Sequence, residues 1–216
     1  MLGFTGLLGD GRSELFQAVF GVTPEYTGNI SVDGKSVRFR TTTQAYAAGI
    51  GYVPRNRKEN GIIKDMSVLE NASIVTYDHF SRAGWINHAT VRRNMEKHVK
   101  DLSIKVDDID LPITSLSGGN QQKVVLAKWL SADPKVLIFD NPTQGVDVGA
   151  KEEIYDIILR LAEQGVAVVI LSSEAQEIIR LCDRALVMYH GKVKGELSDS
   201  QLNEHDIMLL ATGGTL

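Results

Sequence analysis

Two stretches of the chain combine residue types that are suited to binding a phosphorylated ligand. The first, Gly6–Ser13, matches the pattern G-x-x-x-x-G-K-[ST] at every fixed position but one, because Arg12 stands where lysine belongs. Its glycines let backbone N–H groups close on phosphate oxygens, and Ser13 can reach a magnesium ion. A planar guanidinium replaces a point charge poorly, so this difference is not conservative. The pattern predicts a phosphate loop; the alternative is a glycine-rich turn without a ligand.

The second stretch, Thr114–Lys123, begins a helix in a way that favours anions. Ser117 is placed to cap the helix, and two glycines follow it, so that orphan N–H groups and the helix dipole point outward. After one helix, the apolar run Val136–Asp140 ends in a carboxylate, which is the arrangement that holds magnesium beside the phosphates in P-loop nucleotidases. Together with the Gly6–Ser13 loop, these features predict a site that binds a nucleotide and Mg²⁺.

The elements around these residues alternate between short Val/Ile/Leu-rich runs and helical patterns. Such alternation is typical of an α/β fold with a mostly parallel sheet covered on both faces. We expect strands over 2–5, 50–53, 136–139, 166–171, 185–189 and 192–197, and helices over 12–20, 43–48, 119–130, 150–163, 174–181 and 200–211. The alternation in Ile30–Phe39, with a turn at Asp33-Gly34, adds an antiparallel hairpin.

Between about residues 55 and 115 the chain changes to charged loops and amphipathic helices. We interpret this part as a helical subdomain inserted into one domain that spans residues 1–216. Its apolar positions fall on two helix faces: Val68, Leu69 and Ala72 on one, and Val91, Met95, His98, Val99 and Leu102 on the other. We expect Trp85, and Trp129 on the helix after Ser117, to be packing anchors rather than ligand platforms.

Composition excludes several classes of protein. The 27 acidic and 23 basic residues give a net charge of -4, which argues against a protein that mainly binds nucleic acid. The single cysteine, Cys182, cannot form an internal disulfide and indicates a reducing compartment. The longest apolar run, Val166–Leu171, is far shorter than the ~20 residues of a membrane-spanning helix, so we expect any membrane connection to come through a partner. The abrupt start at Met1, without a signal peptide, suggests a fragment whose N-terminal strands are truncated.

These motifs resemble the ATP-binding cassette (ABC) ATPases over the whole chain. Gly6–Ser13 is similar to their Walker A loop, Leu116–Gln121 to their signature motif, Val136–Asp140 to Walker B and Gly145–Asp147 to the D-loop. The resemblance implies a P-loop NTPase fold that binds ATP and Mg²⁺. It implies nucleotide contacts at Gly6, Gly9, Asp10, Gly11, Arg12, Ser13, Ser117, Gly118, Gly119, Gln121 and Asp147, and metal contacts at Ser13 and Asp140.

Longer segments resemble the second cassette of bacterial ribose/galactose/xylose-type sugar import ATPases, which carry two cassettes in tandem on one polypeptide. The matching segments are Arg57–Gly61, Ser67–Asn71, Asn120–Leu130 and Pro142–Lys151. This resemblance implies a peripheral protein on the cytoplasmic face of the cell membrane. Its implied partners are a second cassette, transmembrane permease subunits and, indirectly, a sugar-binding protein, with no nucleic acid.

The chain departs from the pattern of hydrolysing family members at several positions. Asn141 follows the Walker B aspartate where a glutamate handles the attacking water, Ser173 stands at the switch histidine, and Arg55 stands at the Q-loop glutamine. The aromatic residue that stacks on adenine lies upstream of Walker A in the family and has no counterpart in this chain. We therefore hypothesise a degenerate Walker side beside an intact signature. The alternatives are a self-sufficient homodimeric ATPase and a cassette of a soluble, non-transport ABC protein.

Overall fold

The computed structural model describes all 216 residues, which form two compact units. The first unit contains Met1–Tyr52, Lys135–Asn141 and Ile158–Leu216, and the second contains Val53–Pro134 and Pro142–Ile157. The second unit includes the region predicted to be a helical subdomain. The assignment of the whole chain to a single domain stays a prediction.

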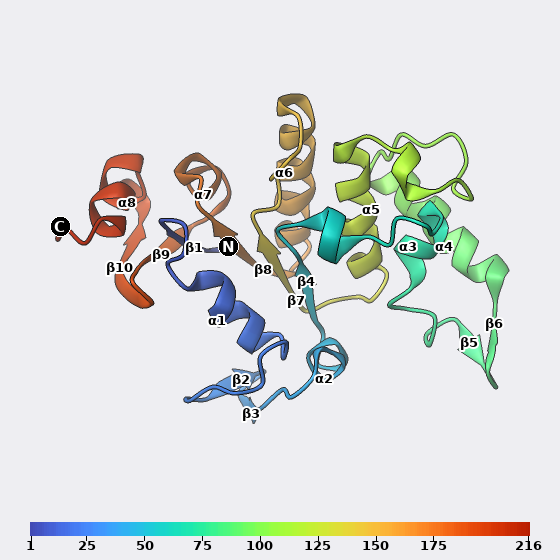
Figure 1. The fold of residues 1–216 in the computed structure, drawn as a ribbon, viewed down its shortest axis with the longest axis horizontal. Coiled ribbons are helices and arrows are strands. Elements are labelled where there is room, and N and C mark those ends of the chain that lie inside the picture. The colour runs from blue at the N-terminus through green and yellow to red at the C-terminus, as the bar shows by residue number, and fades with distance from the viewer. The chain divides into compact units, whose positions relative to one another are not determined.

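A six-stranded sheet forms the centre of the first unit, and Figure 1 labels its elements. Its strands are β1 (Leu2–Gly6), β4 (Ile50–Val53), β7 (Val136–Asp140), β8 (Ala167–Ser172), β9 (Arg184–Tyr189) and β10 (Lys192–Ser198), in the order β10-β9-β1-β8-β7-β4. β1 is parallel to β8 and β9, and β7 is parallel to β8, whereas β10 is antiparallel to β9. A separate hairpin pairs β2 (Ile30–Val32) with β3 (Lys35–Val37). The predicted fold class, mostly parallel with an antiparallel portion, is confirmed.

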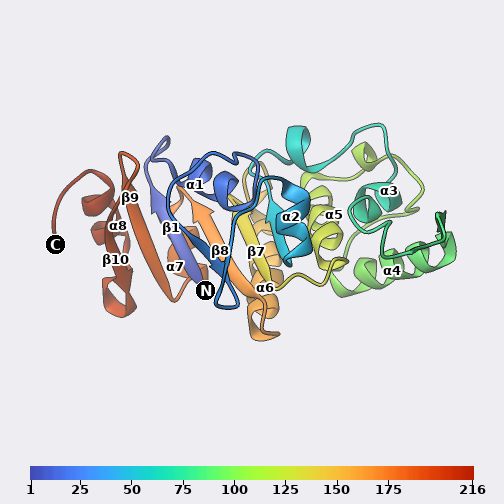
Figure 2. The ribbon, with the colours of Figure 1, turned by 90° about the horizontal axis from the view of Figure 1, so that it is seen from below.

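Helices cover both faces of this sheet, because neighbouring residues of a strand point to opposite sides. On β1, Phe4 packs edge-on against Phe16 of α1 (Arg12–Val19), with ring centroids 4.7 Å apart. A side chain at Gly3, on the other face, would lie 3.1 Å from Ile178 of α7 (Ala175–Leu181). Figures 1 and 2 show α1 and α7 on opposite faces accordingly. Two further helices belong to this unit: α2 (Thr42–Ala47) and α8 (Glu204–Ala211).

The second unit is mainly helical. Its elements are η1 (Arg57–Gly61), α3 (Val68–Ser73), β5 (Ser81–Arg82), β6 (Trp85–Ile86), α4 (His88–Asp101), η2 (Ile113–Ser115) and α5 (Gly118–Leu130), and α6 (Val148–Glu163) begins in it. α3 starts with a capping box in which Ser67 and Glu70 satisfy each other's backbone N–H groups. α3 packs against α4 and α5. No helix of the chain has the length and apolar character needed to cross a bilayer.

Three local predictions differ from the structure. Trp85 is 83% exposed, so the prediction that it anchors packing is wrong; the β5–β6 hairpin carries it outward. Trp129, by contrast, is 9% exposed, as predicted. The last helix begins at Glu204 rather than at residue 200, because the Asn203 side chain caps it by accepting from the Asp206 N–H. The segment Arg57–Gly61, in the part predicted to consist of charged loops and amphipathic α-helices, forms one turn of π-helix.

Candidate functional site

The parallel register brings three candidate segments to one edge of the sheet. β1, β8 and β7 run in the same direction, with Thr5 of β1 beside Ser172 of β8. Their carboxyl ends therefore lie together, and this is the edge where open α/β sheets bind ligands. The loop Gly6–Ser13 leaves β1 here, Asn141 follows β7 and Ser173 follows β8.

The Gly6–Ser13 loop has the backbone of a strand-to-helix phosphate loop. Gly6, Gly9 and Gly11 all have positive φ angles, of 152°, 82° and 94°. Gly11 directly precedes α1 in the left-handed conformation, where an L side chain is strained. The Ser13 hydroxyl makes no hydrogen bond within the chain, which leaves it available to a ligand or an ion. The backbone thus agrees with the predicted loop.

The side chains of the loop form a buried ion pair. Arg12 Nη1 lies 2.5 Å from Asp10 Oδ2, and each of the two side chains is 3% exposed. The same nitrogen donates to the carbonyl oxygens of Gly6 and Leu7, at 3.2 and 3.3 Å. The Arg12 backbone N–H donates to Asp10 Oδ1 at 3.0 Å. The cation at the Walker A lysine position is therefore turned inward, onto its own loop.

Asp140, the predicted metal ligand, is 3% exposed and has a donor at each carboxylate oxygen. The Tyr52 hydroxyl donates to Oδ2 at 2.9 Å, and Asn141 Nδ2 donates to Oδ1 at 2.8 Å. Burial, together with the Asp140 charge, raises the pKa of Tyr52 well above its usual range, so the phenol stays protonated and remains a donor. Asp140 is thereby fixed at the end of β7.

Asn141 and Ser173 are in direct contact. Asn141 Oδ1 accepts from both the backbone N–H and the hydroxyl of Ser173, each at 3.3 Å. Asn141 has a φ of 47°, a left-handed conformation that asparagine tolerates better than most residues. The structure thus brings together the two positions predicted to replace the catalytic glutamate and the switch histidine. Their roles stay predictions.

The oxygen atoms at this edge are of the kind that a magnesium ion binds. Mg²⁺ prefers hard oxygen ligands and usually takes only one or two from carboxylates. Ser13 offers a free hydroxyl, and each Asp140 oxygen keeps a second lone pair beyond its hydrogen bond. The chain has no group of three or more His, Cys, Asp or Glu side chains that could hold a metal ion. Bound beside phosphates, the ion would polarise them.

The residues predicted to form the signature lie in the second unit, at the start of α5. Ser117 is the N-cap, and its Oγ accepts from the Asn120 N–H at 3.4 Å and from Asn120 Nδ2 at 3.0 Å. Gly118 and Gly119 form the first turn. Because the first N–H groups of a helix have no partner within it, this turn is a potential anion site on a thirteen-residue helix.

Close packing explains why glycines occupy this turn. A Cβ at Gly118 would lie 2.5 Å from Arg57 Nη2, and a Cβ at Gly119 would lie 2.6 Å from the Cβ of Ala150. Asp147 Oδ1 accepts from the Ala150 N–H at 2.9 Å, so the predicted D-loop aspartate supports the first turn of α6. The turn containing Gly118 and Gly119 thus rests against both Arg57 and the beginning of α6.

Gln121 faces the interior rather than the end of the helix. It is 8% exposed, and its Nε2 donates to the carbonyl oxygens of Leu116 and Ile113, at 3.1 and 3.4 Å. Its Oε1 is buried without a partner. In this structure Gln121 holds the segment that precedes the signature helix, and its predicted contact with a nucleotide stays a prediction.

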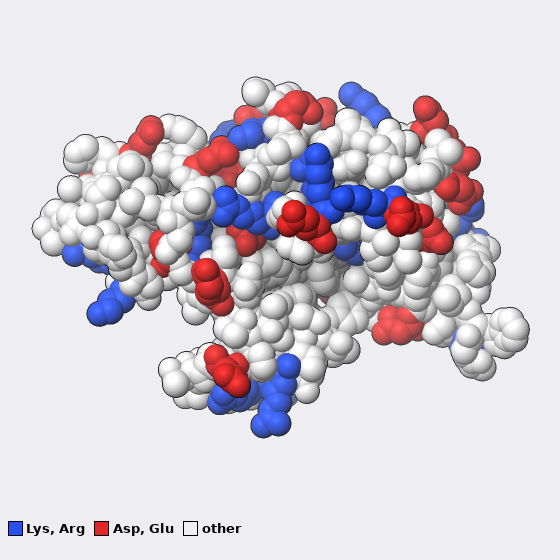
Figure 3. Space-filling model, in the orientation of Figure 1, with Lys and Arg blue, Asp and Glu red and all other residues white.

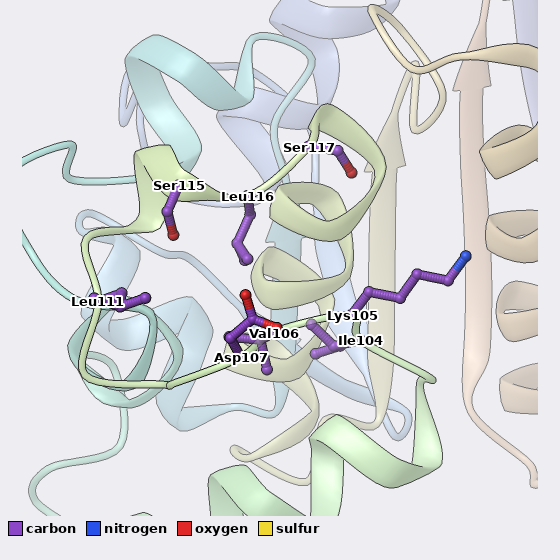
Figure 4. A pocket seen from close by; sticks show the side chains of 8 residues that line it. All are labelled: Ile104, Lys105, Val106, Asp107, Leu111, Ser115, Leu116 and Ser117. Carbon is purple, nitrogen blue, oxygen red and sulfur yellow. The ribbon is translucent and has the colours of Figure 1, made fainter.

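A cavity of about 500 Å³ lies beside the signature segment. Its lining comes from two stretches of chain: Ile104, Lys105, Val106, Asp107, Leu111, Ser115, Leu116 and Ser117. In Figure 4 the Leu116 side chain points toward Asp107, whereas Lys105 extends away from the other side chains. Ser117 stands at the rim, at the start of α5. The cavity therefore adjoins the predicted anion site.

A second cavity, of about 420 Å³, has three basic residues among the six that line it. Its lining consists of Arg55, Asn56, Arg57, Lys58, Gln144 and Gly145. Arg57 is 5% exposed and donates to the carbonyl oxygens of Gln144 and Gly145, both at 3.0 Å, with no carboxylate partner. Burial lowers its pKa. Figure 3 shows Lys and Arg side chains interspersed with Asp and Glu on the face in view, so this face carries no continuous positive surface.

Tyr52 and Arg57 are the two site residues that sequence reasoning missed. In the sequence, Tyr52 is part of an apolar run that predicts a strand. Its hydroxyl reaches Asp140 only because β4 lies beside β7 in the sheet. Arg57 reads as one of several loop charges, although its segment resembles the sugar importers. An arginine beside backbone carbonyls has no signature in a single sequence.

Comparisons with known proteins agree with this geometry. The profile of the ABC transporter family matches residues 1–144. The ribose import ATP-binding protein of Geobacillus kaustophilus is 44% identical over 214 residues, which are 99% of this chain. A putative ribose/galactose/methyl galactoside import ATP-binding protein of Agrobacterium fabrum is 47% identical over 213 residues. The chain spans 43% of the length of each of these relatives.

Solved structures agree on the fold. A nucleotide-free ATP-binding cassette from an ABC transporter superposes with a TM-score of 0.80 at 22% identity, covering 94% of this chain and 81% of its own. A dimeric post-hydrolysis cassette bound to ADP and Pi gives a TM-score of 0.77 at 20% identity, covering 92% and 84%. At these identities the likeness concerns the fold alone.

Proposed function

Because the chain belongs to the ABC transporter family, we propose that it is a cassette of a sugar importer that supplies its signature segment to an ATP site shared with a second cassette. In the family, two cassettes pack head to tail, so that each nucleotide lies between the Walker A loop of one and the signature of the other. The names of the relatives, which are ribose and galactose import proteins, support a sugar as the cargo.

The observation that carries the proposal is the link between Asn141 and Ser173 at the end of Walker B. The Asn141 amide holds Asp140 and Ser173 at once, in the place where a hydrolysing site keeps a carboxylate. An amide can position a water molecule but cannot take its proton, and a general base is typically worth ~10²–10⁴ in rate. We infer that the chain's own Walker side hydrolyses ATP slowly or not at all.

The start of α5, which contains the signature residues, supports a role in a working ATP site. Ser117 caps α5 and leaves the first turn of a glycine-lined helix for an anion, and Asp147 supports α6 beside it. In the proposed assembly, Ser117, Gly118 and Gly119 contact the γ-phosphate on the partner cassette. The Walker side binds ATP through the Gly6–Ser13 loop, with Ser13 and Asp140 as the ligands of Mg²⁺.

The proposed partners follow from this arrangement. They are a second cassette, permease subunits in the membrane and, through the permease, a sugar-binding protein. The chain would act as a peripheral component on the cytoplasmic face of the membrane.

The decisive experiment substitutes Ser117 in the full-length importer, with its permease in liposomes. Ser117→Asn and Ser117→Asp both keep a good helix cap, but only aspartate places a negative charge against a phosphate. We expect transport-coupled ATPase to fall at least about tenfold further in the aspartate variant than in the asparagine variant. If Ser117→Asp left this activity untouched, the signature would not serve a nucleotide and the proposal would fail.

A second variant tests the degenerate side of the proposal. Arg12→Lys, Asn141→Glu and Ser173→His together restore the pattern of a hydrolysing cassette, and we expect them to add turnover that disappears when Asp140 is changed to asparagine. Ready ATP turnover by the unaltered chain alone, abolished by Asp140→Asn, would instead favour a self-sufficient ATPase.

A further inference from the structure

We propose that Asp10 is an internal competitor for phosphate, whose carboxylate occupies the anion position of the Gly6–Ser13 loop until a nucleotide displaces it. The inference rests on the proposed function, in which this loop is the nucleotide's phosphate site. The family resemblance implies that Asp10 contacts the nucleotide. We assign Asp10 the opposite role, that of competing with the phosphate of the nucleotide.

The contacts of Asp10 are those that a bound phosphate would make. Phosphate loops hold an anion with backbone N–H groups of the loop and with a cation at the lysine position. Asp10 Oδ1 accepts from the backbone N–H of Arg12 at 3.0 Å, and Oδ2 accepts from the guanidinium of Arg12 at 2.5 Å. The Asp10 carboxylate therefore binds both a backbone N–H group of the loop and the cation at the lysine position.

The ion pair is shielded from water, which makes it a strong competitor. Both side chains are 3% exposed, and charges so placed are screened much less than charges on the surface. Arg12 Nη1 is also held by the carbonyl oxygens of Gly6 and Leu7. The Arg12 Nε is buried without a hydrogen-bond partner, so the guanidinium still has an unused donor for a second acceptor.

The backbone fixes the carboxylate in this place. A Cβ at Gly6 would lie 2.2 Å from Asp10 Oδ2, so only glycine allows the carboxylate to sit against this part of the loop. The Asp10 N–H donates to the Leu7 carbonyl at 3.2 Å, and the Asp10 carbonyl accepts from the Gly191 N–H at 3.0 Å. A phosphate can therefore enter by rotating the Asp10 side chain out, without a change in the path of the loop.

Displacement has a predictable effect on affinity. A nucleotide binds only the fraction of molecules in which Arg12 is free, so its apparent affinity falls by that fraction. After displacement, the Asp10 carboxylate remains close to the phosphates and repels them. Replacement of Asp10 should remove both effects and tighten binding.

The experiment titrates the 216-residue chain with a fluorescent ATP analogue and magnesium. Asp10→Asn keeps the shape of the side chain and removes its charge, and Asp10→Ala removes the carboxylate entirely. A hydrogen bond to a charged group is worth ~1.5–3 kcal/mol, so we expect binding to tighten by at least about tenfold in both variants. Asp199→Asn, an equal change of charge at an exposed aspartate, is the control and should bind as the unaltered chain does.

The outcomes separate this inference from the proposed function. The gain in nucleotide affinity should be lost when Ser13→Ala is added to Asp10→Asn. That loss would show that the tighter binding occurs at the Gly6–Ser13 loop. If the unaltered chain binds nucleotide and neither Asp10 variant binds more tightly, Asp10 does not compete and the inference is overturned, whereas the Ser117 experiment still tests the proposed function. If no variant binds nucleotide, the loop is not a nucleotide site and the inference falls as well. Melting temperatures show that each variant is folded.

Discussion

At the scale of single residues, Asp140 depends on the Tyr52 hydroxyl. The carboxylate is 3% exposed, and a buried charge is tolerated only when its oxygens are satisfied. Tyr52 provides one of its two donors from a different strand, 88 positions away in the sequence. We therefore regard Tyr52 as a positioning residue for Asp140, the proposed Walker B aspartate.

The change Tyr52→Phe tests this dependence. We expect the free energy of unfolding at about pH 7 to fall by ~1.5–3 kcal/mol, because a charged acceptor loses its donor. Tyr26→Phe is the control, since the Tyr26 hydroxyl is buried without a partner and its loss should have little effect. An equal loss in both variants, measured by urea unfolding, would contradict the role assigned to Tyr52.

The same residue predicts a dependence on alkaline pH. Tyrosine in an unfolded chain titrates near pH ~10, and in the fold the pKa of Tyr52 is raised by burial and by Asp140. The folded chain therefore keeps a proton that the unfolded chain loses, and the stability from this group is complete below pH ~10 and declines above it. Urea unfolding across this range should show a smaller decline for Tyr52→Phe than for the unaltered chain.

At the scale of elements, the strongly patterned parts of the chain were predictable. Val136–Asp140 and the run at 166–171 read as buried strands because they are short, apolar and flanked by helices, and the parallel order of β1, β8 and β7 then places Gly6–Ser13 and Asn141 at one edge. The helix start at Ser117 was predictable because capping is a local property.

Other features depend on contacts that a single sequence does not reveal. The inward turn of Arg12 arises from Asp10 and two carbonyl oxygens, whereas the phosphate-loop pattern describes only residue types and spacing. Trp85 suggested packing because of its size, but its position on a two-residue strand is decided by the hairpin. Side-chain partners at the site thus required the fold.

Lys128 tests the packing between α5 and η1. Its Nζ donates to the Gly61 carbonyl at 2.5 Å, and burial lowers its pKa to about 8. In the unfolded chain lysine titrates near pH ~10.4, so the unfolded state holds the proton more tightly and the contribution of this group to stability rises between about pH 8 and pH 10.

We therefore expect Lys128→Met to abolish this rise. Relative to the unaltered chain, the variant should be more stable at about pH 7 than at about pH 9.5, by ~2 kcal/mol, since the protonation states of the folded and unfolded chain differ over about 1.5 pH units of this range and one pKa unit corresponds to ~1.4 kcal/mol. The lost hydrogen bond to Gly61 affects both values equally and cancels. Lys100→Met, at an exposed lysine on α4, should show no such difference. Unfolding in urea at the two pH values measures it.

The glycines of the first turn of α5 give a second prediction at this scale. Alanine is normally favoured over glycine in a helix by ~1 kcal/mol, but at Gly119 its Cβ would lie 2.6 Å from Ala150. We expect Gly119→Ala to lower the free energy of unfolding by ~1–3 kcal/mol through overpacking. At exposed Gly149, in the first turn of α6, the added Cβ would lie 3.6 Å from Asp147 and alanine should stabilise the chain. Stabilisation at both positions, measured by thermal unfolding, would contradict the close approach of α5 and α6.

At the scale of the whole molecule, the candidate residues divide between the two compact units. The phosphate-type loop, Asp140, Asn141 and Ser173 belong to the first unit, and Ser117–Gly119 with Asp147 belong to the second. In the first set Arg12 pairs with Asp10, and Asn141 contacts both Asp140 and Ser173, whereas in the second set the first N–H groups of α5 have no partner within the helix. This asymmetry predicts how the chain associates.

We expect the chain to bind a second cassette in an ATP-dependent way, and not a copy of itself. A separately expressed cassette with a complete Walker A loop, and with its catalytic glutamate changed to glutamine so that ATP persists, should form a 1:1 complex with this chain. Ser117→Asp should weaken the complex by at least about tenfold because it sets a carboxylate against the γ-phosphate, whereas Ser117→Asn preserves the cap. Sedimentation velocity with and without ATP measures both. An ATP-dependent homodimer of this chain that is as strong as the mixed complex would show that its own Walker side is sufficient, and would replace the shared-site proposal with a self-sufficient ATPase.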